Sequence, residues 1–373
     1  MAAEKQKTKK AKSGARHLQT ERKSKVMRTS IKNKNGLLTR LGSKTKLAAV
    51  ALVLSAAITT PVRSAPPQPG APKATLLASG LNLGLGSAVG PDGALYVAET
   101  AAARITRVDP NTGATSVFTD GLPPAAVGYG SPVDLAFIDD TCYALVALVG
   151  PEYGGPWGAT GIYRVDGPHS VTLIADTGEW SAAHLPCCFE IIDRVGAPFA
   201  LQAYRGGFLM VDGHHNRVLR ITLDGAISQV IQFDNIVPTG LAVRGNTIFL
   251  GEAGPVPHRS QDGKVVTFSI DSPSATEIAS GVPLIVDVEL GPGRRLYALS
   301  NGVYSGDPEG SPGRHNTGSI LAVNADGTFT PLVTGLDQPT SLELIGNTAF
   351  VVTFTGEVWR FDKLTRPPFG ISK

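Results

Sequence analysis

The stretch "GSAVGPDGALYVAETAAARITRVDPNTGATSVFTDGL" (Gly86–Leu122) decides the fold, because a variant of it recurs along the chain. A second full copy is "GAPFALQAYRGGFLMVDGHHNRVLRITLDGAISQVIQF" (Gly196–Phe233). Each copy has a Gly-containing turn, an apolar strand that ends in an acid, an arginine, and a short closing strand. A repeat of this length made of four short strands is typical of a β-propeller.

Six such cassettes can be placed along the chain, and the last of them has residues for only three strands. The cassettes span residues 82–122, 131–180, 196–233, 237–282, 284–336 and 338–362. The segment "ATLLASGL" (Ala74–Leu81) resembles "FTPLVTGL" (Phe329–Leu336) and is predicted to supply the missing fourth strand. The sequence therefore predicts an all-β, six-bladed propeller over 74–362, in which an N-terminal strand completes the last blade and removes an open sheet edge.

The chain begins with a segment that resembles a targeting signal. The apolar run Leu47–Ile58 follows a strongly basic leader and has the length of a signal-peptide core. We expect residues 1–65 to be a leader with a signal peptide, with Met27 as an alternative start, residues 66–73 to be a Pro-rich linker, and 363–373 to be a tail. This organisation predicts a secreted or periplasmic protein; an uncleaved leader would instead tether it to a membrane.

The charge is divided unevenly between the leader and the rest. Residues 1–65 hold 16 of the 34 lysines and arginines and two of the 31 acids, so the rest has 18 bases, 29 acids and a net charge of −11. An acidic surface repels nucleic acid and attracts cations. We therefore expect no nucleic-acid partner, and we expect a monomer.

Two insertions, both between the second and third strands of a blade, are predicted to share one face of the disc. They are Val149–Gly161 and Asn301–Gly318, and a third irregular stretch, Gly178–Val195, joins the second and third blades. Long loops on a rigid scaffold are common places for function. The predicted ligand-binding residues of these loops are Tyr153, Trp157, Trp180, His184 and Asp307. The alternative is that the rings only roof the central channel.

Acids and one amide give a candidate site for Ca²⁺ or another divalent cation. Glu99, Asp212 and Glu252 end the second strands of three blades, and Asp287 lies on an innermost strand, as does Asp134. Oxygen ligands that converge on a channel suit a hard cation, and Asn301 could add an amide oxygen. The alternative is that these acids cap turns or accept hydrogen bonds from backbone amides of neighbouring blades.

Two smaller groups of residues also leave alternatives open. His214 and His215 could bind a transition metal together with His184 or His169, or one could act as a general base, or the pair could form a solvated hairpin tip. In an exported protein, Cys142 could pair with Cys187 or Cys188, the last two could bridge each other, or the thiols could stay free.

The quoted cassettes, together with "LIADTGEW" (Leu173–Trp180) and "SGVPLIVDVELGPGRRLYALS" (Ser280–Ser300), resemble the ScyD/ScyE family of bacterial exported six-bladed propellers. Val211–Ile221 resembles a single NHL repeat, and the family is related to gluconolactonase-like propellers. The resemblance spans about residues 74–362 and implies secretion. The family has small residues where His214 and His215 stand, and "SAAHLPCCFE" (Ser181–Glu190) replaces an acid-rich stretch.

Two functions follow as expectations. The first is a non-catalytic binding or scaffold protein that holds a small molecule, a glycan or a protein on one face of the disc. The alternative, implied by the gluconolactonase-like relatives, is a metal-dependent lactonase or related hydrolase with a cation in the channel. The sequence has no GxSxG elbow, phosphate loop or HExxH motif, which disfavours serine-hydrolase and nucleotide-dependent activities.

Overall fold

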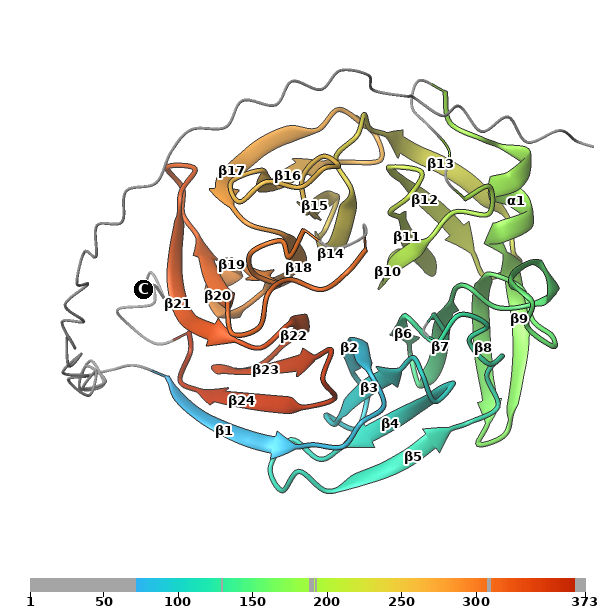
Figure 1. The fold of residues 1–373 in the computed structure, drawn as a ribbon, viewed down its shortest axis with the longest axis horizontal. Helices are drawn as coiled ribbons and strands as arrows, with labels where there is room; N and C mark the ends of the chain where they lie inside the picture. The colour runs from blue at the N-terminus through green and yellow to red at the C-terminus, as the bar shows by residue number, and fades with distance from the viewer. Residues whose placement is uncertain (1–71, 129, 188–190, 192, 307–309, 366–373) are drawn as a thin grey trace, which may run out of the picture. The chain divides into compact units, whose positions relative to one another are not determined.

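A computed structural model describes residues 72–365, except residues 129, 188–190, 192 and 307–309. They all belong to the second of the two units into which the chain divides, Ala65–Lys373; the first unit is Met1–Ser64. The described residues form six four-stranded antiparallel sheets arranged as the blades of a ring (Figure 1). The predicted six-bladed β-propeller is thus confirmed.

In each blade the first strand of the cassette lies next to the ring axis and the others follow outward (Figure 1). The strands of blades one to three are β2 (Gly84–Val89), β3 (Leu95–Glu99), β4 (Arg104–Val108) and β5 (Thr115–Thr119); β6 (Asp134–Ile138), β7 (Thr141–Val146), β8 (Gly161–Gly167) and β9 (Ser170–Asp176); and β10 (Pro198–Ala203), β11 (Gly207–Asp212), β12 (Arg217–Thr222) and β13 (Ile227–Gln232).

Blades four to six repeat this order. Their strands are β14 (Pro238–Arg244), β15 (Thr247–Glu252), β16 (Gly263–Phe268) and β17 (Thr276–Val282); β18 (Ile285–Leu290), β19 (Leu296–Ser300), β20 (Gly318–Val323) and β21 (Phe329–Leu336); and β22 (Pro339–Ile345), β23 (Thr348–Thr353), β24 (Val358–Asp362) and β1 (Lys73–Ala78). Short 3₁₀ turns lie at Pro151–Tyr153 and Pro292–Arg294.

Blade six closes as expected. The strand β1 pairs antiparallel with β24, from Lys73 opposite Asp362 to Ala78 opposite Val358. It ends three residues before the predicted limit of Leu81, whose amide instead donates to the Gly356 carbonyl over 3.1 Å. The first and last described segments are therefore held in one sheet, and no strand edge of β24 is left open.

The alternation of side chains along each second strand explains why the blades need one another. On β3, Tyr96 and Ala98 pack against blade two, whereas Leu95 and Val97 pack against blade six. Every residue of β3 is buried, although successive side chains point to opposite faces of the sheet. Among the described residues there are six such apolar clusters, one between each pair of neighbouring blades. The core is thus divided into six interfaces.

The connection between blades two and three departs from the prediction of an irregular stretch. It begins with a helix, α1 (Thr177–Ala183), because the Asp176 carboxylate caps the Glu179 amide at 2.7 Å and small residues follow. No helix in the described part of the chain is long and apolar enough to span a bilayer. The predicted leader, signal peptide and most of the linker (1–71), and the tail from 366, lie outside the described residues.

Candidate functional site

A cavity of about 720 Å³ occupies the ring axis, and all six innermost strands line it. One end of the cavity, which we call the mouth, lies on the face where the second and third strands of each blade are joined, which we call the loop face. Residues from these connections line the mouth, namely Ala147, Leu148, Gly213, His214, His258, Gly310, Ser311, Pro312 and Phe354. The second insertion, at residues 310–312, therefore stands directly over the channel.

Two aspartates of the channel wall each tie their own blade to the next one. The Asp134 carboxylate on β6 accepts the Leu201 amide of β10 at 2.7 Å, and Asp287 on β18 accepts the Leu342 amide of β22 at 2.8 Å. A Cβ atom at Gly86 of the preceding blade would lie 2.7 Å from the Asp134 Cα atom, so no larger residue fits there. Each aspartate therefore accepts a hydrogen bond from a backbone amide of the next blade, which is the alternative to a cation site given in the sequence analysis.

The same arrangement occurs twice around the ring. Gly240 of blade four packs against Asp287 in the same way that Gly86 packs against Asp134. A Cβ atom at Gly240 would lie 2.5 Å from the Asp287 Cα atom. Burial raises the pKa of Asp287 to about 7, against the opposing hydrogen bonds from the Leu342 and Val288 amides. Burial likewise raises the pKa of Asp134 well above its usual value.

Two glutamates also lie on the channel wall, on the innermost strands of blades five and six. Glu289 on β18 and Glu343 on β22 occupy equivalent positions of adjacent blades, opposite Tyr297 and Phe350 respectively. Both line the cavity. Within the described residues, the Glu289 carboxylate has one hydrogen-bond donor, the Leu290 amide, and none is found for Glu343. They differ from Asp134 and Asp287 in lacking a partner from the next blade.

Burial and neighbouring charges raise the pKa of both glutamates. For Glu289, burial and the charge of Asp287 raise the pKa to about 8. For Glu343, burial acts first, and the charges of Glu289, Asp287 and Asp134 raise its pKa further. Because these carboxyl groups share one cavity and raise one another's pKa, the channel wall favours a proton or another cation near them. The sequence prediction missed both glutamates, although "VDVEL" and "TSLEL" carry Glu at matching places in successive cassettes.

The acids that end second strands belong to ion pairs within their own blades. Glu99, Asp212 and Glu252 lie directly opposite Arg104, Arg217 and Lys264 on the third strands. Arg104 donates to both oxygens of Glu99 at 2.8 Å, and Arg217 Nε donates to Asp212 at 3.1 Å. Lys264 Nζ lies 3.5 Å from Glu252 Oε2. The acid followed by a base in the cassette thus marks a cross-strand pair.

The strength of each pair determines the direction of the pKa shift. Burial opposes the charge of Glu99, but hydrogen bonds from Arg104, Thr106 and the Asn82 amide outweigh it and lower the pKa. Burial is likewise outweighed at Asp212, by His215 and Arg217, and the pKa is lowered. At Glu252 burial dominates over the attraction of Lys264 and raises the pKa to about 7.

The five residues predicted to hold a cation are not brought together as one set. Asn301 donates from Nδ2 to the Pro339 carbonyl at 2.7 Å and accepts the Gly313 amide, so it anchors the second insertion to blade six. In the part of the chain that the structure describes, no three His, Cys, Asp or Glu side chains converge where they could hold a metal ion. The metal site stays a prediction that no contact in the described structure supports.

The two adjacent histidines have different surroundings. His215 is fully buried, with Nε2 2.8 Å from the Asp193 carbonyl and Nδ1 3.0 Å from Asp212. The interpretation of His215 as part of a solvated hairpin tip is therefore wrong. His214 lines the cavity mouth, and its buried Nδ1 atom has no hydrogen-bond partner in the described structure. His169 is exposed and paired with Asp120, between blades one and two.

The aromatic residues predicted to bind a ligand lie away from the channel. The rings of Trp180 and His184 stack at 4.2 Å along α1, with the Arg217 guanidinium 5.0 Å from the Trp180 ring centre. Tyr153 donates its hydroxyl hydrogen to Asp193, and Trp157 is 47% exposed. None of these four lines the cavity, and Asp307 lies outside the described residues. Their ligand-binding role stays a prediction.

The predicted disulfide of Cys142 is not formed. Cys142 is a free, buried thiol at the start of β7, where burial raises its pKa to about 12. Cys187 follows α1, which leaves blade two after its outermost strand, whereas Cys142 lies near the start of β7. Cys188 lies outside the described residues, and a Cys187–Cys188 bridge stays a prediction.

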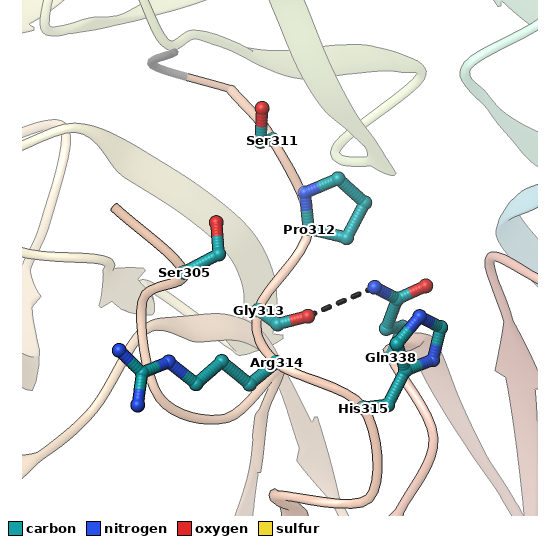
Figure 2. A pocket seen from close by; sticks show the side chains of 7 residues that line it. All are labelled: Ser305, Ser311, Pro312, Gly313, Arg314, His315 and Gln338. Carbon is teal, nitrogen blue, oxygen red and sulfur yellow. Dashed lines mark hydrogen bonds between the residues drawn. The ribbon is translucent and has the colours of Figure 1, made fainter. Parts of the chain in front are cut away.

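A second, shallower pocket of about 470 Å³ adjoins the second insertion (Figure 2). Arg314 and His315 line it, and Gln338 Nε2 donates to the Gly313 carbonyl at 2.9 Å (Figure 2). His315 also pairs with Asp337 at 2.7 Å. Ser311 and Pro312 line both this pocket and the channel, so this short segment separates them.

The fold is similar to that of several enzymes. A gluconolactonase from Xanthomonas campestris is 14% identical over 78% of this chain and 89% of its own, with a TM-score of 0.55. A PQQ-bound aldose sugar dehydrogenase from Streptomyces coelicolor is 14% identical over 79% and 99%, with a TM-score of 0.53. A streptogramin B lyase is 12% identical over 78% and 97%, with a TM-score of 0.50.

These likenesses are at the level of the fold alone, because the identities are so low. No protein-family model matches the sequence, and no curated protein matches it. The neighbours therefore support the propeller fold, and the site has to be interpreted from this chain's own residues.

Proposed function

We propose that this protein is an exported, non-catalytic binding protein of the ScyD/ScyE type that takes a small organic molecule into its central channel from the loop face. The observation that carries the proposal is the cavity of about 720 Å³ along the axis. Its size is within the range of small-molecule sites, roughly 300–1,000 Å³, and such sites combine apolar walls with a few polar groups.

The wall of the cavity has this composition. Phe137, Leu148, Phe199, Leu201 and Phe354 provide apolar surface. The polar groups are of two kinds: carboxyl groups on the innermost strands, and histidines at the loop-face end of the cavity. An apolar body would gain affinity from the wall, and the polar groups would fix its orientation.

The rim of the cavity is tied to the blades at Gly313. Asn301 accepts the Gly313 amide and donates to the Pro339 carbonyl of blade six, and Gln338 donates to the Gly313 carbonyl. A preformed rim reduces the ordering cost of binding. The proposed setting is the periplasm or the cell exterior, with the protein as a monomer; a glycan or a protein on the loop face is the other occupant to test.

The test is a blocked channel. In Ser311→Trp, a large ring at the mouth should reduce the affinity for any channel ligand at least tenfold, measured by calorimetry after a thermal-shift screen of small molecules. A ligand at 100 times its Kd stabilises the protein by about 2.7 kcal/mol, which such a screen detects. Ser116→Trp is the matched control, because Ser116 is exposed on the outer strand β5.

Three outcomes would contradict the proposal. One is a ligand whose affinity is the same in Ser311→Trp and in the wild type. Another is capture of a glycan or protein partner that Ser311→Trp leaves unchanged, which would move the function to the surface of the loop face. The third is turnover of lactones with a stoichiometric divalent metal, which would establish the hydrolase alternative.

A further inference from the structure

We propose that the ligand of the central channel is an organic cation, a protonated amine or amidine on an apolar body, whose charge pairs with Glu289 and Glu343. This inference rests on the proposed function and names its ligand class. It starts from the charges of the cavity wall. Four carboxyl groups line the cavity, and no Lys or Arg is found among the described residues that line it.

The two glutamates are the groups that remain available to a ligand. Asp134 and Asp287 already accept amides of the next blade, at 2.7 and 2.8 Å. Glu343 is half-buried, lines the cavity and has no hydrogen-bond partner in the described structure. A carboxyl group on the channel wall that has no donor from the protein can accept a hydrogen bond from a ligand without losing one to the protein.

The position of the pair indicates how the ligand is oriented. Glu289 lies two residues beyond Asp287 on β18, and therefore about 7 Å further from the loop face. The apolar residues Phe199, Leu148 and Phe354 lie nearer the mouth. A molecule that enters from the loop face would thus place its cationic end first, between blades five and six, and leave its apolar body along the upper wall.

An organic cation fits this pair better than a metal ion does. Calcium needs about six to eight oxygen ligands. In the described residues no three acidic, His or Cys side chains are placed together to hold a metal ion. A single ammonium or amidinium group, with its several N–H donors, can be satisfied by two carboxylates inside an apolar wall.

Binding should release protons, because the cation replaces them. Burial and mutual repulsion raise the pKa of Glu289 to about 8 and raise that of Glu343 as well. The other titratable groups that line the cavity are Asp134 and Asp287 on the wall and His214 and His258 at the mouth. Affinity for a cation should therefore rise from pH 6 to pH 8.5, by up to about tenfold per pH unit.

The experiment uses the full chain and three probes that share a phenyl ring, namely 2-phenylethylamine, 2-phenylethanol and phenylacetate. At pH 8.5 the amine should bind at least tenfold more tightly than the alcohol, and phenylacetate most weakly. Glu289→Gln and Glu343→Gln should each remove the preference for the amine and its pH dependence. Glu179→Gln is the matched control, since Glu179 is exposed on α1.

The possible results separate this inference from the proposed function. Binding of the alcohol or phenylacetate that is lost in Ser311→Trp, with no preference for the amine, overturns the cation assignment and leaves the binding function standing. A preference for the amine that survives both Gln variants also overturns it. If Ser311→Trp changes the binding of none of the three probes at millimolar concentration, both proposals fail. Thermal unfolding of each Gln variant verifies that it is folded.

Discussion

At the scale of single residues, the acids that end second strands show how one sequence pattern gives different energetics. Glu99 and Asp212 have lowered pKa values because hydrogen bonds to basic partners outweigh burial. Glu252 has a raised pKa because Lys264, at 3.5 Å, is too distant to offset burial. The residue types alone therefore do not set the charge state; the distance to the partner does.

The first prediction concerns Arg217, which is completely buried. It donates to Asp212 at 3.1 Å and to the His184 carbonyl at 2.6 Å. Arg217→Ala would leave the Asp212 charge buried without its basic partner, and we expect a loss of about 3–5 kcal/mol in the free energy of unfolding. Denaturant titration measures it.

The control for this variant is Arg107→Ala. Arg107 pairs with Asp92 at 2.7 Å, but both side chains are about one-third exposed. Such a surface pair contributes about 0–1 kcal/mol. Equal losses for the two variants would show that burial does not strengthen the Asp212–Arg217 pair.

At the scale of the elements, the middle strands carry the core and the outer strands close it. The strand β11 is buried at all six positions, because its alternate faces pack on blades two and four. By contrast, β1 is exposed at its first four positions. Its contribution is therefore the ladder of hydrogen bonds to β24 and the closure of the ring.

The second prediction tests this closure. A chain that begins at residue 72 keeps β1 and should unfold cooperatively at the same temperature as the full chain without its leader. A chain that begins at residue 80 lacks β1, leaves the edge of β24 open, and should have a lower unfolding temperature and a greater tendency to associate. Calorimetry and light scattering measure these two effects; equal behaviour of the two chains would contradict the role given to β1.

At the scale of the whole molecule, the channel chemistry is a product of ring closure. Glu289 and Glu343 belong to strands that are neighbours only because blades five and six pack together. The resulting repulsion is a cost to the empty protein, and a bound cation would relieve it. A binding site that destabilises its own empty state is consistent with the stability cost often found at functional sites.

The third prediction follows from the sign of these pKa shifts. Because folding raises the pKa of Glu289 from about 4.5 to about 8, its contribution to stability is complete below pH 4.5 and is lost as the pH rises to 8. The double variant Glu289→Gln/Glu343→Gln cannot ionise at these positions. It should be more stable than the wild type above pH 8, and the advantage should shrink towards pH 4.5.

Unfolding curves between pH 4.5 and 9 measure this difference. Glu179→Gln, on an exposed helix position, should show no such trend. A double variant that is less stable than the wild type at every pH would indicate that the two glutamates have stabilising partners in the empty protein.

The architecture could be predicted from sequence because its signals are local and repeated. Turns such as Pro91–Gly93, apolar runs such as Leu95–Glu99, and the incomplete last cassette together gave six blades and a strand from the N-terminus. Each of these signals depends on backbone preferences and on side-chain alternation within a few residues. They can therefore be recognised without knowing which strands pack together in the folded protein.

The site could not be predicted in the same way, because it depends on which polar groups remain unpaired after the blades pack. Glu99 and Asp212 have the same chemistry as Glu343, yet Arg104 and Arg217 neutralise the first two, and Glu343 faces the cavity without a partner. Trp157 and Tyr153 looked like ligand-binding rings but lie away from the channel. Local preference therefore accounts for the ring, whereas the channel and its charge arise from contacts between strands far apart in the chain, which only the packed structure brings together.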